Sequence, residues 1–98
     1  MKILALGRDV PGVTDEQFGP HLKAEATRAW ELHQQGMIRE LYFRADEDAA
    51  VLVLECGNLA EAERALASLP LVREELIAFD LIPLRAYPGF ARLFAADG

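Results

Sequence analysis

The sequence predicts an α+β domain whose elements follow the order βαββαβ. Short runs of β-branched, leucine and aromatic residues alternate with two longer segments of helical periodicity. Glycine or proline stands at most of the junctions between them. No linker or low-complexity tract divides the 98 residues. We therefore expect one domain over residues 1–98, which ends in a short C-terminal arm at residues 87–98.

The first half of the chain predicts a strand, a helix and a second strand. Residues 2–7 form the first strand, and a Thr-x-x-Gln capping pattern opens a helix over residues 14–35. Pro20 interrupts the first turns of this helix, so the helix restarts or kinks there. Gly36 ends it as a left-handed C-cap. Residues 37–44 are rich in aromatic and apolar residues and form the second strand.

The second half repeats the pattern in the order strand, helix, strand. An acidic turn at residues 46–48 leads into a strand over residues 50–56. An Asn-x-x-Glu capping pattern then opens a helix over residues 58–69, which ends before a proline. A final strand covers residues 76–86, and a Tyr-Pro-Gly sequence releases the arm at residues 87–98.

This order of elements predicts the ferredoxin-like arrangement, with one antiparallel four-stranded sheet. Right-handed crossovers place both helices on one face of the sheet. The first and third strands are then central, and the second and fourth are edges. Pro83 lies within the fourth strand, and proline is tolerated on an edge strand.

Both faces of the predicted sheet are apolar, although two helices can cover only one. In the strands over residues 50–56 and 76–86, large apolar side chains occupy both alternating sets of positions. We therefore expect a homodimer formed sheet to sheet. The alternative is that the arm, residues 87–98, folds back over its own sheet, but twelve residues are too few to cover four strands.

Composition excludes several classes of protein. Ten Lys and Arg against sixteen Asp and Glu give a net charge of −6, which does not suit a nucleic-acid backbone or an anionic membrane. Cys56 is the only cysteine, so we expect it in the core and not in a disulfide. The apolar runs are too short for a membrane span or a signal peptide, which predicts a cytoplasmic protein.

No metal or cofactor site is expected. The two histidines, His21 and His33, are twelve residues apart and lack the spacing of a zinc pair. The isolated glycines form neither a dinucleotide-binding fingerprint nor a phosphate-binding loop.

Glu25 is the main candidate catalytic residue because it interrupts the apolar stripe of the first helix. It lies seven residues from both Phe18 and Leu32, so its carboxylate points at the sheet. His21 lies one turn earlier on the flank of the same stripe, and a buried carboxylate near a histidine suits proton transfer. The alternative is that Glu25 pairs with an inward arginine such as Arg39 and only holds the helix on the sheet.

Four further residues are candidates for substrate contact. Trp30 lies at the edge of the apolar stripe, and Tyr42 lies in the second strand. Arg39 is expected to share a sheet face with the apolar residues of its strand, where its guanidinium would bind a substrate carboxylate or form a salt bridge. Asp80 lies within the run Leu-Ile-Ala-Phe-Asp-Leu-Ile-Pro-Leu and is expected to be buried, as an acid or base or as an inter-subunit partner.

Three segments resemble the muconolactone isomerase family. They read His-Leu-Lys-Ala-Glu at 21–25, Gly-Met-Ile-Arg-Glu-Leu-Tyr at 36–42 and Ser-Leu-Pro-Leu at 68–71, and the similarity spans about residues 14–88. The tail at residues 87–98 departs from the family pattern. The resemblance implies a dimeric α+β barrel, in which two sheets face each other, and possible larger homo-oligomers.

The same resemblance implies proton movement on a small lactone acid without a cofactor. Lys23 and Glu25 match polar positions of the family, and Arg39 matches its strand arginine. Helical phase, however, puts Lys23 outside the pocket. Because this fold group also contains oxygenases, haem enzymes and binding proteins, the fold alone does not decide the chemistry.

Two functional hypotheses follow from these observations. In the first, the protein is a cofactor-free isomerase-like enzyme in which Glu25 shuttles a proton, Arg39 anchors an anionic substrate, and His21 or Tyr42 assists. Trp30 and Asp80 are the remaining candidate substrate contacts. In the second, the protein is a non-catalytic homo-oligomer that binds a small molecule in the same pocket.

Overall fold

The computed structural model describes residues 1–96, which form four strands and a set of short helices. In chain order the elements are β1 (Lys2–Asp9), α1 (Asp15–Phe18), the 3-10 turn η1 (Gly19–His21), α2 (Leu22–Gln34), β2 (Ile38–Phe43), β3 (Ala50–Glu55), α3 (Leu59–Ala67), α4 (Pro70–Arg73), β4 (Ile77–Leu84) and the 3-10 helix η2 (Gly89–Phe94).

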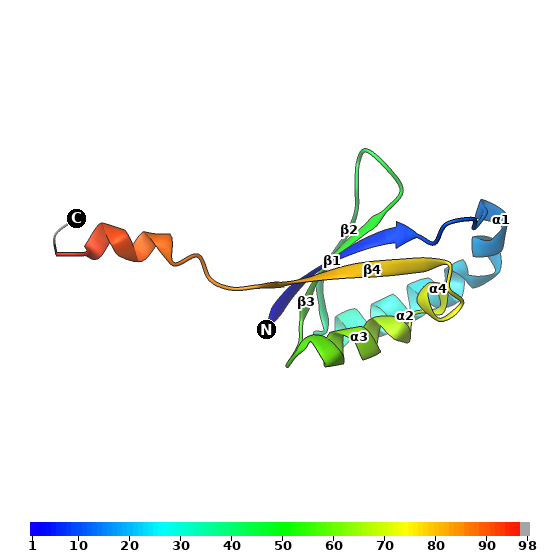
Figure 1. The fold of residues 1–98 in the computed structure, drawn as a ribbon. Coiled ribbons are helices and arrows are strands. Elements are labelled where there is room, and N and C mark those ends of the chain that lie inside the picture. The colour runs from blue at the N-terminus through cyan, green and yellow to red at the C-terminus, as the bar shows by residue number, and fades with distance from the viewer. Residues whose placement is uncertain (97–98) are drawn as a thin grey trace.

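The four strands form one antiparallel sheet in the order β2-β3-β1-β4, which confirms the predicted fold class. The helices α2, α3 and α4 lie together on one side of this sheet (Figure 1). Strand β4 pairs with β1 alone, so Pro83 stands on an edge strand as expected.

The predicted helices are each divided in two. The first is divided at Pro20, where η1 separates the four-residue α1 from the longer α2. The second ends at Ala67 and is followed by the extra helix α4, which begins at Pro70. Proline is favoured in the first turn of a helix because the amide that it lacks has no partner there in any case. The same residue type therefore ends one helix and begins the next.

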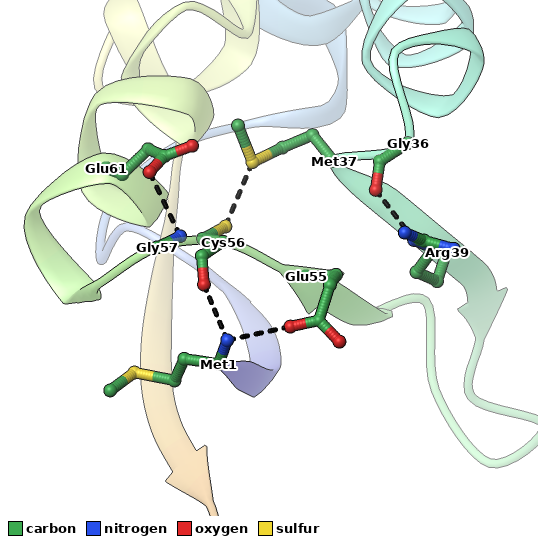
Figure 2. Close-up of polar contacts among 8 residues, drawn as sticks. All are labelled: Met1, Gly36, Met37, Arg39, Glu55, Cys56, Gly57 and Glu61. Atoms are coloured by element: carbon green, nitrogen blue, oxygen red, sulfur yellow. Dashed lines mark hydrogen bonds and ion pairs between the residues drawn. The ribbon is translucent and has the colours of Figure 1, made fainter.

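The hydrophobic core lies between the helices and the sheet face that they cover. It contains Ile3, Ala5, Leu32, Ile38, Leu52, Leu54, Cys56, Ala62, Ala65, Leu66 and Leu69, and all of these are buried. Cys56 is thus a core residue, as the sequence predicts. Its Sγ lies 2.9 Å from Sδ of Met37, and burial raises the pKa of its thiol (Figure 2).

The N-terminal residue is bound to the end of β3. The ammonium group of Met1 donates to the carbonyl oxygen of Cys56 at 2.7 Å and lies 2.8 Å from Oε2 of Glu55 (Figure 2). The ammonium is the main reason why the pKa of Glu55 lies below its ordinary range. Strand β1 is therefore held at its start by a charged contact as well as by the sheet.

An irregularity in β2 corrects one expectation from the sequence. Ile38 pairs with Leu54 and Glu40 pairs with Val53, so Arg39 is an extra residue at this point. The extra residue shifts the alternation of the strand. Ile38 is therefore buried under the helices, and Arg39 does not share the face of the apolar residues that follow it.

The second face of the sheet is uncovered in the single chain. Its central positions are apolar and half-buried, namely Leu4, Leu6, Val51 and Val53. Asp80 lies on this face beside Leu6 and is exposed, so the expectation of burial is wrong for the single chain. The apolar run around Asp80 reflects a strand that is apolar on both faces, not a residue enclosed on both sides.

The C-terminal arm extends away from the sheet instead of folding back over it (Figure 1). Three apolar side chains of η2 are exposed: Phe90 at 68%, Leu93 at 77% and Phe94 at 86%. The arm contributes to the length of the molecule, whose dimensions are 61 × 29 × 20 Å. The alternative in which the arm covers its own sheet is thus wrong for residues 85–96.

Among the described residues, no helix combines the length and the apolar character needed to cross a bilayer. The cytoplasmic location remains a prediction.

Candidate active site

A cavity of about 880 Å³ opens between α2 and the covered face of the sheet. It lies where β1 ends and β4 begins, and the loop before β3 closes one side. Most of its lining is apolar or aromatic: Gly7, Phe18, Leu22, Ala26, Ala29, Trp30, Ile38, Leu41, Phe43, Ala49, Ala50, Leu52, Leu69, Leu71, Ile77 and Phe79. Its polar lining residues are Arg8, Asp9, Asp15, Glu25, His33 and Asp48.

Helix α2 supplies one wall of the cavity through residues at helical spacing. Glu25, Ala26, Ala29, Trp30 and His33 all line it, and they fall three or four residues apart along one side of the helix. The alanines leave space beside the helix, while the larger side chains lie at its two ends. The wall therefore has a carboxylate near the start of α2 and an imidazole near its end.

Glu25 is half-buried, and one of its oxygens is fixed by the backbone. Its Oε1 accepts a hydrogen bond of 2.9 Å from the backbone N–H of Leu71 in α4. Burial raises the pKa of the Glu25 carboxyl above its ordinary value of 4.5, and the hydrogen bond from Leu71 opposes this in part. A carboxyl group with a raised pKa at the edge of an apolar cavity can both accept and return a proton.

The expected pair of Glu25 with Arg39 does not form. Arg39 instead donates from Nε to the carbonyl oxygen of Gly36 at 2.8 Å, away from the cavity (Figure 2). This position follows from the irregularity in β2, which removes Arg39 from the covered face of the sheet. Arg39 is not among the residues that line the cavity.

Two predicted site residues lie on the opposite face of the sheet. Tyr42 is exposed and donates from its hydroxyl to Oε1 of Glu40 at 2.8 Å, a bond that raises the pKa of Tyr42. Asp80 lies 3.4 Å from Nε of Arg8. The sheet separates both residues from Glu25 within one chain.

The remaining predicted residues divide between the cavity and its surroundings. Trp30 lines the cavity and is exposed. His21 ends η1, one turn before Glu25, but is not a lining residue. Lys23 lies on the exposed side of α2, as helical phase predicts. Of the six predicted residues, the structure thus brings Glu25 and Trp30 together at the cavity.

His33 is a cavity residue that the sequence interpretation did not select. Its Nδ1 lies 2.8 Å from the carbonyl oxygen of Ile38, and its ring lies 5.6 Å from that of Trp30. The signal was present, because His33 shares the helical arc of Phe18 and Leu32. It was considered only as a zinc ligand.

Within residues 1–96, no group of three or more His, Cys, Asp and Glu side chains is placed to hold a metal ion.

Comparison with known proteins identifies the relatives of the chain. Residues 9–89 match the family model for muconolactone delta-isomerase. No curated protein sequence matches the chain. Among solved structures, muconolactone isomerase matches with a TM-score of 0.72 and 23% identity, over 90% of this chain and 92% of that one. A 5-chloro-2-hydroxyhydroquinone dehydrochlorinase from Burkholderia phenoliruptrix, solved in complex with 2,5-dihydroxybenzoquinone, matches with a TM-score of 0.68 and 15% identity, over 91% of this chain and 98% of that one.

Proposed function

Because the chain belongs to the muconolactone delta-isomerase family, we propose that it is an isomerase-like enzyme that moves a proton within a small lactone or aromatic-derived ring compound. The observation that carries this proposal is the position of Glu25. Its carboxyl group lies at an apolar cavity large enough for such a compound, and burial raises its pKa.

The proposed step needs no net gain or loss of atoms or electrons. The Glu25 carboxylate removes a proton from a carbon next to the substrate carbonyl, and the electron pair of the broken C–H bond moves into the conjugated system. The carboxylic acid then returns the proton to a carbon further along that system, so that one double bond changes place. Burial makes the carboxylate a stronger base, which favours the first half of the step.

The hydrogen bond from Leu71 serves this role by orienting the carboxyl group. It occupies Oε1 of Glu25 and leaves Oε2 to meet the substrate. A donor on one oxygen fixes the rotamer of a side chain that would otherwise move in a half-open cavity. The dehydrochlorinase relative was solved with a ring compound, 2,5-dihydroxybenzoquinone, which supports a ring ligand in the corresponding fold.

The test is the Glu25→Gln variant with α-angelica lactone in deuterated buffer as the probe. The wild-type protein is expected to shift the ring double bond and to incorporate solvent deuterium. Glu25→Gln is expected to lose both activities by at least about a hundredfold, the lower range for a general acid–base residue. Glutamine keeps the acceptor for Leu71, so circular dichroism is expected to show an unchanged fold.

Glu31→Gln is the matched control, because Glu31 lies on the same helix, is exposed and does not line the cavity. Full activity in Glu25→Gln contradicts the proposed role. A variant that fails to fold supports the structural alternative, in which Glu25 only joins α2 to α4.

One observation favours the second candidate function, a non-catalytic binding protein. The lining is largely apolar, and Arg39, the expected anchor of an anionic substrate, lies outside it. An apolar cavity can hold a ligand by burial alone. Wild-type protein that binds lactones or quinones but never exchanges a proton supports this second function and contradicts the first.

We also propose that the protein acts as a homodimer, or as a larger homo-oligomer that contains this dimer. The uncovered sheet face and the exposed apolar side chains of the arm both support association with a second copy. Two sheets that meet through their uncovered faces would form a dimeric α+β barrel.

A further inference from the structure

The strongest unassigned feature of the molecule is the imidazole of His33 at the far end of the cavity from Glu25. We propose that the cavity binds an uncharged aromatic compound along α2, with a hydroxyl group of that compound donating to Nε2 of His33. This inference rests on the proposed function of the cavity, and it names the class of ligand.

The hydrogen bond to Ile38 determines which nitrogen of His33 carries the proton. A carbonyl oxygen only accepts, so Nδ1 of His33, 2.8 Å from it, must be the donor. In the neutral ring Nε2 then holds a free electron pair and is a hydrogen-bond acceptor. The contact with Ile38 also fixes the ring against β2, so this acceptor is held in place before a ligand arrives.

The spacing along α2 suits a ligand with two different ends. His33 follows Glu25 by eight residues, a rise of about 12 Å along the helix. Ala26 and Ala29 line the cavity between them and leave room beside the helix. Trp30 stands next to His33, with 5.6 Å between the ring centres, so an aromatic ring can pack in this space.

The charges at the cavity disfavour an anionic ligand. Asp9, Asp15 and Asp48 line it together with Glu25. Apart from His33, the basic lining residue in the described part of the chain is Arg8, and its Nε lies 3.4 Å from Oδ2 of Asp80 on the other face. A ligand carboxylate would lose water among like charges without a free guanidinium or ammonium to replace it.

The first experiment measures the protonation of His33 directly. Long-range ¹H–¹⁵N correlation spectra at pH 8 distinguish the two imidazole tautomers, and His21→Asn assigns the signals, because the chain has two histidines. The expected result is an Nδ1-protonated His33. An Nε2-protonated ring overturns the proposal.

The second experiment measures binding of three matched ketones by calorimetry: 6-hydroxy-2-tetralone, 2-tetralone and 6-carboxy-2-tetralone. The hydroxyl compound is expected to bind wild-type protein about three- to tenfold more tightly than 2-tetralone, the effect of one net hydrogen bond. The carboxylate is expected to bind most weakly. Equal binding of the first two compounds, or tightest binding of the carboxylate, overturns the proposal.

The His33→Asn variant separates ligand binding from a structural role. The asparagine Nδ2–H can replace Nδ1–H toward Ile38, but the variant has no acceptor at the position of Nε2. It is expected to bind 2-tetralone like the wild type and to lose the preference for the hydroxyl compound. Gln34→Asn, on an exposed residue of the same turn, is the control and keeps the preference.

Retained preference in His33→Asn contradicts the proposal. Its failure is distinguishable from failure of the proposed function. The latter is measured by proton exchange in Glu25→Gln, and the binding preference needs no turnover.

Discussion

At the scale of single residues, Glu25 combines a demand of function with a demand of stability. Its carboxyl group is half-buried and has one backbone donor, the N–H of Leu71. Full ionisation in this position opposes burial, which is why the pKa is raised. The same property that makes Glu25 a good base therefore makes its charged form a burden for the folded state.

This relation predicts how Glu25 affects stability as the pH changes. The unfolded chain loses the Glu25 proton near pH 4.5, while the folded chain keeps it to higher pH because the pKa is raised. Between these two values the folded state binds more protons, so the free energy of unfolding falls as the pH rises. Glu25→Gln is expected to remove this fall and to be slightly more stable than the wild type at pH 7, by less than about 1 kcal/mol after allowance for solvent screening.

Urea denaturation of wild type and variant at pH 4 and pH 7 checks this prediction. The difference between the two proteins is expected to be larger at pH 7. A variant that is equally destabilised at both pH values contradicts it, and indicates that the carboxylate makes a favourable contact beyond the bond to Leu71.

The site could be predicted from the sequence where helical periodicity was sufficient. Glu25 was found because it interrupts a regular apolar stripe, and the structure places it at the cavity. Arg39 was misplaced because strict alternation was applied to a strand with one extra residue, and nothing in the composition of β2 reveals that residue. The partner of Glu25 was also beyond periodicity, since it is a backbone N–H from a helix 46 residues away in the sequence.

At the scale of elements, the ends of α2 show how local sequence places the cavity wall. Gly36 has φ of 83°, which a side chain rarely adopts, and it turns the chain from α2 into β2. This turn is what brings His33 to the carbonyl of Ile38. Gly19 is different, because its φ of −45° is helical and no atom blocks a Cβ there.

We expect opposite effects from the same substitution at these two glycines. Gly36→Ala is expected to lower the free energy of unfolding by about 1–2 kcal/mol, because it forces a side chain into the left-handed region. Gly19→Ala is expected to raise it by about 0.4–1 kcal/mol, because it restricts the unfolded chain at a compatible position. Equilibrium urea denaturation measures both, and destabilisation of similar size in the two variants contradicts the assignment.

The order of elements could be predicted because each carries its own signals, while the breaks within helices depend on tertiary packing. The capping patterns, the glycine at 36 and the apolar runs gave βαββαβ, and the observed strand order agrees. The extra helix α4 was missed because four residues carry no periodicity. It forms where Pro70 begins a turn and Glu25 accepts from its backbone, an interaction between distant segments.

At the scale of the whole molecule, the fold leaves apolar surface in two places. The uncovered sheet face presents half-buried leucine and valine side chains, and the arm presents exposed phenylalanines beyond the sheet. Both features are visible in the sequence as an excess of apolar residues over what one covered face requires. A second copy can cover both, since a two-fold axis between the sheets gives each partner the same surface.

A charge on the uncovered face is therefore expected to break the dimer without unfolding the chain. Val53 lies in the middle of β3, and its side chain is on the face without helices, opposite Leu4 of β1. In Val53→Lys, two ammonium groups would have to lose water in a two-fold interface, so association is expected to weaken about a hundredfold or more. Leu59→Lys, at an exposed position at the start of α3, is the control and is expected to keep the dimer. Sedimentation equilibrium at micromolar concentration measures all three proteins, and a wild-type monomer, or a dimer that survives Val53→Lys, shows that this face is not the interface.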